Sequence, residues 1–311
     1  MAVIGMGNAP CSWGTLEFEG VEQDAIDCTR MLDELKGTGY AGTELGDWGF
    51  MPTDAPALRG KLASRDLAML AAFVPVAFRH SAAHAAGVEQ AVKTARLIAT
   101  VAELGGQAHA PFIVLADENG SDPTRTRNAG RITPEMALSS ADQATFAAGT
   151  EEVARAVLSE TGLRCVFHHH CAGYVETPDE IARLLDATDD ALVGLVFDTG
   201  HYAFACGAET GAEAMAGLHR FADRVWYLHF KDCDATLAAR SQVEAWDYFE
   251  SVGRGVFCEL GAGCVDFPAV TDWTRDNYDG WVVVEQDVLP GMGDPKESAR
   301  RNREYLRGIG L

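Results

Sequence analysis

The sequence lacks cysteines at paired spacing, although it contains eight cysteines in 311 residues. No two of them form a C-x-x-C pair, which is the spacing typical of structural zinc sites and redox-active thiols. Scattered single cysteines are typical of reduced thiols in a cytoplasmic protein. The pattern therefore argues against a disulfide framework and a structural zinc site, and we expect a cytoplasmic location.

Long apolar runs are missing as well. No stretch approaches the roughly 20 apolar residues that a membrane-spanning helix needs. The N-terminal sequence MAVIGMGNAPCSWG has neither a basic segment nor an extended apolar core, so it does not resemble a secretory signal. We therefore expect no association with a membrane.

Positive charge is scarce. Twenty-five Lys and Arg residues stand against 46 Asp and Glu residues, which gives a formal net charge of −21. A surface of this sign repels phosphate backbones and anionic lipids, so nucleic acid is not an expected partner. The same charge favours divalent cations. The charge also argues against a highly charged anionic substrate, unless a local basic patch or a metal offsets it. A small molecule is the expected partner, and assembly into a homo-oligomer is left open.

The nucleotide-binding fingerprints G-x-G-x-x-G and G-x-x-x-x-G-K-[ST] are also missing, which argues against a doubly wound open sheet, the main alternative fold. What is present is a regular alternation of short β-branched runs and longer segments of helical period. The predicted strands are 3–12, 40–45, 67–74, 109–115, 163–168, 192–198, 225–230 and 281–285. The predicted helices are 21–38, 54–64, 83–104, 138–160, 178–186, 211–221, 237–252 and 295–307.

Eight strands alternating with eight helices, without a linker-like break, predict an α/β protein: a single (β/α)8 TIM barrel that occupies residues 1–311 as one domain. Two longer polar segments, 117–134 and 253–267, are expected to be loops. Both would lie at the carboxyl ends of the strands, where barrels of this kind place their active sites.

Polar residues end the apolar strands. They are Glu44, His168, His170, Asp198, His201, His229, Lys231, Asp232, Glu285 and Asp287. Because side chains alternate along a strand, His168 and His170 share one face, and so do His229 and Lys231. Imidazoles and carboxylates at four successive strand ends indicate a divalent-metal site with mixed nitrogen and oxygen ligands, suited to Mn²⁺, Co²⁺ or Zn²⁺.

Each of these residues has a simpler explanation when taken alone. A histidine after a strand is more often a hydrogen-bonded rim residue than a ligand, and Asp198 before Thr-Gly-His is typical of an Asx-turn or a helix cap. Their occurrence on four successive strands is what favours the metal site.

The motifs NAPCSWG, GYAGTELGDWGFMPTD, HHH…VET, VFDTGH, LHFKD and VVVEQD resemble the xylose-isomerase-like (sugar isomerase/epimerase) TIM-barrel superfamily. The resemblance extends from Ala9 to about Leu306. Within the superfamily it is closest to the inosose dehydratase branch, which acts on keto-polyol rings such as 2-keto-myo-inositol.

The resemblance implies a metal site formed by His168, Asp198, His229 and Glu285, with Mn²⁺ or Co²⁺ most expected and Zn²⁺ as an alternative. It also implies substrate contacts, for which the expected residues are Glu44, His201, Trp13 and Lys231. The candidates for the base that removes a proton are Glu285, His170 and Glu44. Lys231 is expected beside the cation, which would depress the pKa of its ammonium group and suit it to act as an acid or electrophile.

One position departs from the superfamily pattern. Its isomerases and epimerases usually carry glutamate at the first ligand position, at the end of the fifth strand, where this chain has His168. Epimerisation needs a base on each face of the substrate carbon, so we expect dehydration instead. The alternative is a keto-sugar isomerase or epimerase, or a β-eliminating lyase of 3-keto sugars; a metal-dependent endonuclease and a non-catalytic sugar-binding barrel fit the sequence less well.

Overall fold

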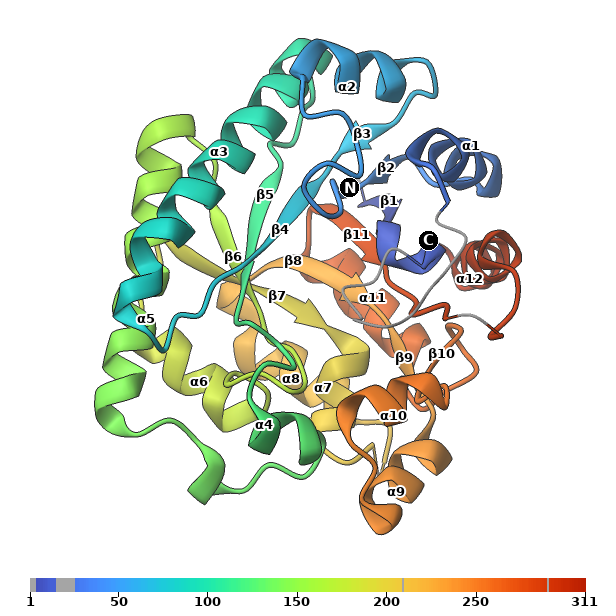
Figure 1. The fold of residues 1–311 in the computed structure, drawn as a ribbon. Coiled ribbons are helices and arrows are strands. Elements are labelled where there is room, and N and C mark those ends of the chain that lie inside the picture. The colour runs from blue at the N-terminus through green and yellow to red at the C-terminus, as the bar shows by residue number, and fades with distance from the viewer. Residues whose placement is uncertain (1–3, 15–25, 209, 290) are drawn as a thin grey trace.

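The computed structural model describes residues 4–14, 26–208, 210–289 and 291–311. Its centre is a sheet of nine strands in the order β3-β2-β1-β11-β8-β7-β6-β5-β4 (Figure 1). The two edge strands, β3 (Ala68–Met69) and β4 (Ala71–Pro75), are separated only by Leu70. Leu70 bridges them, because its N–H donates to Thr43 O and its carbonyl accepts from Phe112 N. The sheet therefore closes on itself as an eight-stranded parallel barrel, and the predicted fold is confirmed.

Every predicted strand overlaps a barrel strand of the structure. Besides β3 and β4, these are β1 (Ile4–Asn8), β2 (Gly42–Thr43), β5 (Phe112–Ala116), β6 (Cys165–His168), β7 (Val193–Asp198), β8 (Val225–Phe230) and β11 (Gly280–Val284). Residue 3 of the first predicted strand lies outside the described residues. A short antiparallel pair, β9 (Asp232–Cys233) with β10 (Phe257–Cys258), follows β8 and was not predicted.

Seven predicted helices are also found. They are α1 (Cys28–Thr38), α2 (Ala55–Ala63), α3 (Ser81–Gly105), α5 (Ser140–Thr161), α6 (Pro178–Asp186), α8 (Glu213–Phe221) and α12 (Pro295–Gly308). Residues 21–25 of the first predicted helix lie outside the described residues. The helix start predicted at Thr177 is confirmed. The Thr177 side chain accepts a hydrogen bond from Glu180 N, and the Glu180 side chain accepts one from Thr177 N, which completes a capping box. Among the described residues, no helix has both the length and the apolar character needed to cross a bilayer.

The predicted helix 237–252 is wrong as a single element. The structure has α9 (Ala235–Glu244) and α10 (Tyr248–Gly253). Ala245 ends the first helix in a left-handed conformation, with φ of 55°, and Asp247 caps the second by accepting from Glu250 N. An interruption of this kind needs a backbone conformation that L residues rarely adopt, so helical periodicity alone could not reveal it.

Six further helical segments were not predicted: the α-helices α4 (Pro123–Arg127), α7 (Thr199–Ala205) and α11 (Phe267–Asn277), and the 3-10 helices η1 (Pro10–Trp13), η2 (Pro134–Met136) and η3 (Ala222–Arg224). The helix α11 lies between the excursion after β8 and the last barrel strand. Its start was readable in the sequence, because Asp266 caps it and Pro268 occupies its first turn.

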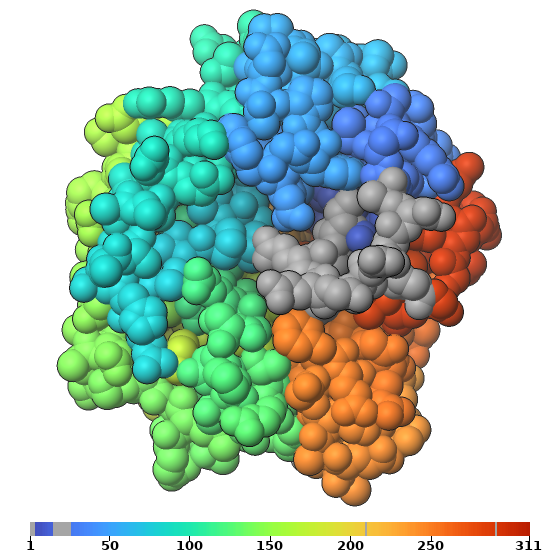
Figure 2. All heavy atoms as spheres, viewed as in Figure 1, coloured from blue at the N-terminus to red at the C-terminus, as the bar shows by residue number. Residues whose placement is uncertain are grey.

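Two excursions lie side by side at one face of the barrel (Figures 1 and 2). One is the segment after β5 that contains α4, and the other contains α9 and α10. Arg131 joins them, since its guanidinium donates to Ser241 O at 2.9 Å and to Trp246 O at 3.0 Å. The first excursion overlaps the predicted loop 117–134, although α4 interrupts it. The second was predicted as a helix, and the other predicted loop, 253–267, follows it along the chain.

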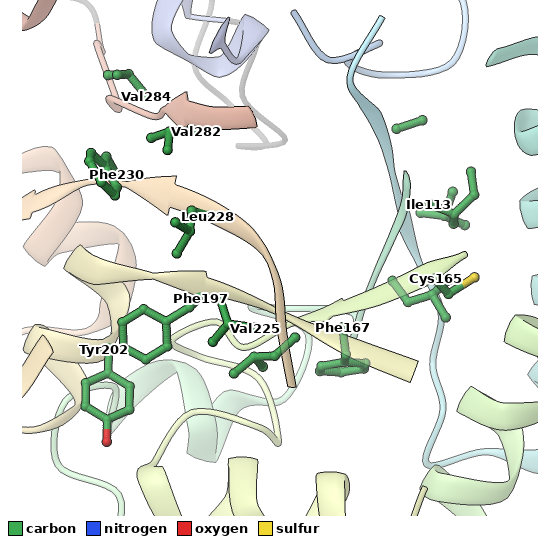
Figure 3. Close-up of a cluster of buried hydrophobic side chains, with 14 of the residues drawn as sticks. Ile113, Cys165, Phe167, Phe197, Tyr202, Val225, Leu228, Phe230, Val282 and Val284 are labelled. Carbon is green, nitrogen blue, oxygen red and sulfur yellow. The ribbon is translucent and has the colours of Figure 1, made fainter. Parts of the chain in front are cut away.

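Alternate residues along the strands face two apolar layers. Figure 3 shows the outer layer, where Phe167, Phe197, Leu228 and Phe230 pack with residues of the surrounding helices. The inner layer fills the barrel interior and contains strand residues together with Ala9 and Leu70, which directly follow β1 and β3. It consists of Ala9, Leu70, Ala71, Val114, Val166, Val196, Tyr227 and Val283.

Candidate metal centre

The inward face of the barrel continues from apolar to polar residues at the carboxyl ends of the strands. Two residues beyond the inward-facing Val166, Val196, Tyr227 and Val283 come His168, Asp198, His229 and Glu285. Strand pairing places Asp198 directly opposite His229. The strand period of two therefore brings all four polar side chains to the same end of the barrel interior.

These four residues, which we call the four-residue cluster, offer ligand atoms that all lie within 4.8 Å of one another. His168 Nε2 and His229 Nδ1 lie 3.8 Å and 4.0 Å from Asp198 Oδ2, and His229 Nδ1 lies 3.0 Å from Glu285 Oε2. Asp198 Oδ2 and His229 Nδ1 are buried and make no hydrogen bond. Buried polar atoms normally have partners, so these atoms fit a divalent cation with mixed nitrogen and oxygen ligands.

Glu44 sets the orientation of His229. Its Oε1 atom lies 2.9 Å from His229 Nε2 and accepts a hydrogen bond from the Tyr227 hydroxyl at 2.9 Å. A carboxylate at Nε2 keeps the proton on that nitrogen and turns Nδ1 toward the cluster, which is the arrangement that typically supports a metal-bound histidine. The expected contact of Glu44 with substrate is untested, but Glu44 does line the cavity described below.

Negative charge dominates the cluster. Burial alone would lower the pKa of His229, yet Glu44 and Glu285 outweigh burial and raise it to about 10. Burial raises the pKa of Asp198 to about 7. By contrast, burial and the neighbouring His229 lower the pKa of His168 well below its usual value. A divalent cation would neutralise this excess of carboxylates and displace the His229 proton.

The depression of the Lys231 pKa that a bound cation would cause stays a prediction; without a cation, the neighbouring carboxylates shift this pKa in the opposite direction. Burial would lower it, but Asp287, Glu285 and Asp198 raise it well above its usual value. Its Nζ donates to Glu285 Oε1 at 2.7 Å and to Asp287 Oδ2 at 2.9 Å. Lys231 is only 1% exposed and lies over the Phe257 ring. It is therefore a charged partner that positions Glu285 and Asp287, and it has a clear structural reason to be there.

Two expected substrate contacts lie away from the cavity. His201 is completely buried, with Nε2 3.5 Å from Lys231 Nζ and its ring 3.9 Å from that of His170. Trp13 is 2% exposed, and its indole N–H donates to Glu34 at 3.0 Å. The 3-10 helix after β1 explains the second case, because it turns Cys11 toward the cavity and Trp13 into the core. Neither residue lines the cavity in the described part of the chain, so their contact with substrate stays a prediction.

The three histidines alternate as their spacing predicts. His168 and His170 both line the cavity, whereas His169 packs outward against Phe197 and Tyr202. Nδ1 of His170 lies 2.6 Å from the carbonyl oxygen of Cys171. Burial lowers the pKa of His170 to about 4, so its imidazole is neutral.

The cavity opens above the four-residue cluster. Its wall contains His168, His229, Glu285, Glu44 and His170, all identified from the sequence as site candidates. It also contains Asp287, which the sequence identified as a polar residue at a strand end, and residues that the sequence did not identify, namely Cys11, Asp47, Asn119, Tyr248 and Phe249. Tyr248 and Phe249 begin α10, so the undetected break in the predicted helix 237–252 is the reason they were missed.

A closed (β/α)8 barrel with a histidine and carboxylate cluster at the carboxyl ends of its strands defines a TIM-barrel enzyme. Residues 32–309 match the model of the xylose isomerase-like TIM barrel family. The chain belongs to this family, as the sequence motifs predicted.

The chain is also similar to individual proteins of known type. The chain is 30% identical to an inosose dehydratase of Geobacillus kaustophilus, over 97% of this chain and 93% of the relative. It is 25% identical to an inosose dehydratase of Clostridium perfringens, over 98% and 97% of the two chains. Among solved structures, the IOLI protein with a bound zinc atom matches with a TM-score of 0.67 and 12% identity, over 98% of this chain and 97% of that one.

Proposed function

We propose that this protein is a metal-dependent dehydratase, a hydro-lyase that removes water from a keto-polyol ring such as 2-keto-myo-inositol. The observation that carries the proposal is the four-residue cluster with histidine at its first position, His168, inside a cavity that is otherwise rich in carboxylates. The relationship to inosose dehydratases along nearly the whole chain supports this choice of reaction.

His168, Asp198, His229 and Glu285 would hold the metal ion. Two nitrogen and two carboxylate ligands suit Mn²⁺ and Co²⁺, which we propose as the physiological ions, and they also suit Zn²⁺; the related IOLI structure contains zinc. When bound, the cation supplies a Lewis acid that polarises a substrate carbonyl and acidifies the adjacent C–H bond.

The surrounding side chains prepare the site for proton transfer. Lys231 binds Glu285 Oε1 and Asp287 Oδ2, so both carboxylates are held in fixed positions at the cavity wall. Glu44 and Glu285 lie at opposite nitrogens of the His229 ring, Glu44 at Nε2 and Glu285 at Nδ1. The residue that takes the proton from carbon is proposed to be Glu285, Glu44 or His170, since each lines the cavity.

The cysteines and the charge of the cavity support a proposed cytoplasmic location and a proposed small-molecule substrate. All eight cysteines are free, as expected of a cytoplasmic protein. The substrate is proposed to be a neutral polyol or keto-sugar, in keeping with the acidic cavity.

Turnover in deuterated water tests the reaction. With 2-keto-myo-inositol and the Mn²⁺-loaded protein, we expect a dehydrated product with new ultraviolet absorbance and no epimer of the recovered ketone. The reason is that His168 replaces one of the two carboxylate bases that epimerisation requires. The variant His168→Glu should still bind Mn²⁺ but lose dehydration, because the added negative charge weakens the Lewis acid.

Chromatography of the recovered ketone distinguishes the alternatives. Abundant deuterated epimer from the unaltered protein, without dehydrated product, would identify a keto-sugar epimerase or isomerase. Elimination seen only with 3-keto sugars would identify a β-eliminating lyase.

A further inference from the structure

Asn119 lies in the cavity wall, and the proposed chemistry gives it no role. It is partly buried, between β5 and α4, and shares the cavity with Glu44 and Glu285. Among the described residues that line the cavity, it is the one with a side-chain amide. Its backbone N–H donates to Asp117 O at 2.9 Å, whereas the side-chain amide has no hydrogen-bond partner in the described part of the chain.

The segment that carries Asn119 is held against the loop after β6 by hydrogen bonds on both sides of this residue. Before it, Asp117 Oδ2 accepts from Tyr174 N at 3.0 Å. After it, Gly120 N donates to Ala172 O at 3.0 Å. The backbone that carries the amide is therefore positioned before any ligand enters.

Gly173, in the loop after β6, leaves the space that the Asn119 side chain occupies. A Cβ atom added to Gly173 would lie 2.2 Å from Asn119 Oδ1 and 3.4 Å from Asn119 Cγ. Gly173 is not among the residues with positive φ, whereas the preceding Ala172 is, with φ of 67°. Glycine is therefore found where the Asn119 amide needs room, and not where the backbone needs a left-handed conformation.

This contact decides which end of the amide remains available. The oxygen of Asn119 faces Gly173, where an NH₂ group would find only the C–H group of Cα and no acceptor. The NH₂ group, with two donors, is the other end of the planar amide. An ionised carboxylate such as that of Glu285 only accepts hydrogen bonds. Asn119 therefore supplies a donor in a cavity wall that is rich in acceptors.

We infer that Asn119 is a specificity-determining residue whose side-chain NH₂ group donates a hydrogen bond to one hydroxyl oxygen of the bound polyol. Gly173 is a positioning residue, which acts through Asn119 by leaving room for its amide. The inference rests on the proposed function only in that the occupant of the cavity is a polyol. A ring that lacks this hydroxyl leaves the amide donor without its partner, so it should bind more weakly.

The test measures binding rather than turnover. Mn²⁺-loaded protein is titrated calorimetrically with myo-inositol and with its monodeoxy analogues, each lacking one hydroxyl group. We expect the wild-type protein to bind one analogue about tenfold more weakly than myo-inositol, the effect of roughly one hydrogen bond.

Asn119→Ala should weaken myo-inositol binding by about the same factor and abolish discrimination against that analogue alone. A general disturbance of the site would weaken all ligands equally and would leave the discrimination in place. The matched control is Asn128→Ala, which removes an exposed amide that donates to Thr124 O. It should keep the wild-type ranking.

Gly173→Ala tests the positioning role. The added methyl group should displace the Asn119 amide and weaken myo-inositol binding about as much as Asn119→Ala does. In the double variant the two losses should not add, because both act on the same hydrogen bond. Gly60→Ala, where an added Cβ meets nothing within 4 Å, is the control and should leave binding unchanged.

The inference is overturned if the wild-type protein discriminates against no analogue, or if Asn119→Ala keeps the wild-type ranking. Addition of the two losses in the double variant would overturn the role of Gly173. Failure of the proposed function has a different signature. In that case the wild-type protein does not dehydrate 2-keto-myo-inositol, while the Asn119-dependent ranking is still observed.

Discussion

Two clusters of buried charge stand at the carboxyl end of the barrel, and they differ in how completely their polar atoms are paired. The first, which we call the Arg125 cluster, consists of Arg125, Glu176 and Glu180, all at most 5% exposed. Arg125 binds both oxygens of Glu180 at 2.8 Å and donates to Gly173 O at 2.7 Å. Glu176 accepts from the backbone N–H groups of Gly130 and Ala172.

The four-residue cluster is also buried, apart from Glu285, whose side chain is 13% exposed, but it is incompletely paired. Asp198 Oδ2, His229 Nδ1 and His168 Nδ1 have no hydrogen-bond partner. In the Arg125 cluster, the Glu180 carboxylate pairs with the guanidinium and the Glu176 carboxylate with backbone N–H groups. The Arg125 cluster joins the loop after β6 to the segment that contains α4. The difference indicates that buried charge alone does not identify a functional site; unpaired ligand atoms with an excess of one charge do.

Breaking the Arg125 cluster should have the largest effect on stability. Arg125→Met leaves two buried carboxylates without their cation, so we expect the free energy of unfolding to fall by about 3–5 kcal/mol. Urea denaturation of the metal-free protein measures the loss. The control Arg220→Met removes an exposed pair with Asp179 and should cost less than about 1 kcal/mol. Equal small losses in both variants would contradict the structural role of the Arg125 cluster.

Glu44→Gln should have a smaller effect, and on a different property. It weakens the support of His229 without removing a proposed ligand, so we expect metal affinity to fall by roughly 10–100-fold while the fold is retained. Calorimetric titration with Mn²⁺ measures the change. Glu34→Gln, which alters the partner of Trp13 outside the cavity, is the matched control. Unchanged affinity in Glu44→Gln would show that Glu44 does not orient a metal-bound histidine.

The sequence predicted the barrel well because its strands alternate between two apolar layers. The same period of two accounts for the juxtaposition of His168, Asp198, His229 and Glu285, which needs only that the strands be parallel and end at the same height. The alternation of each strand and the polar residue at its end are local sequence features that repeat along the chain, so each strand can be predicted separately.

Features that depend on long-range contacts could not be read in this way. Trp13 and His201 follow strand ends like the other candidates. Trp13 does not line the cavity because it lies in a 3-10 helix that places it in the core. His201 does not line it because its ring is buried next to Lys231. The raised pKa of Lys231 depends on Asp287, 56 residues away in the chain. Tyr248 enters the cavity because Ala245 adopts a left-handed backbone, which periodicity does not reveal.

The metal content of Asp198→Ala and Glu285→Ala, beside that of the unaltered protein, tests the central claim most directly. After loading with Mn²⁺ and desalting, elemental analysis should find one ion per chain in the unaltered protein. Removing a ligand should cost far more than the roughly 10–100-fold typical of a supporting residue, so both variants should retain little metal. Stoichiometric metal in both variants would contradict the assignment of the four-residue cluster as the metal centre.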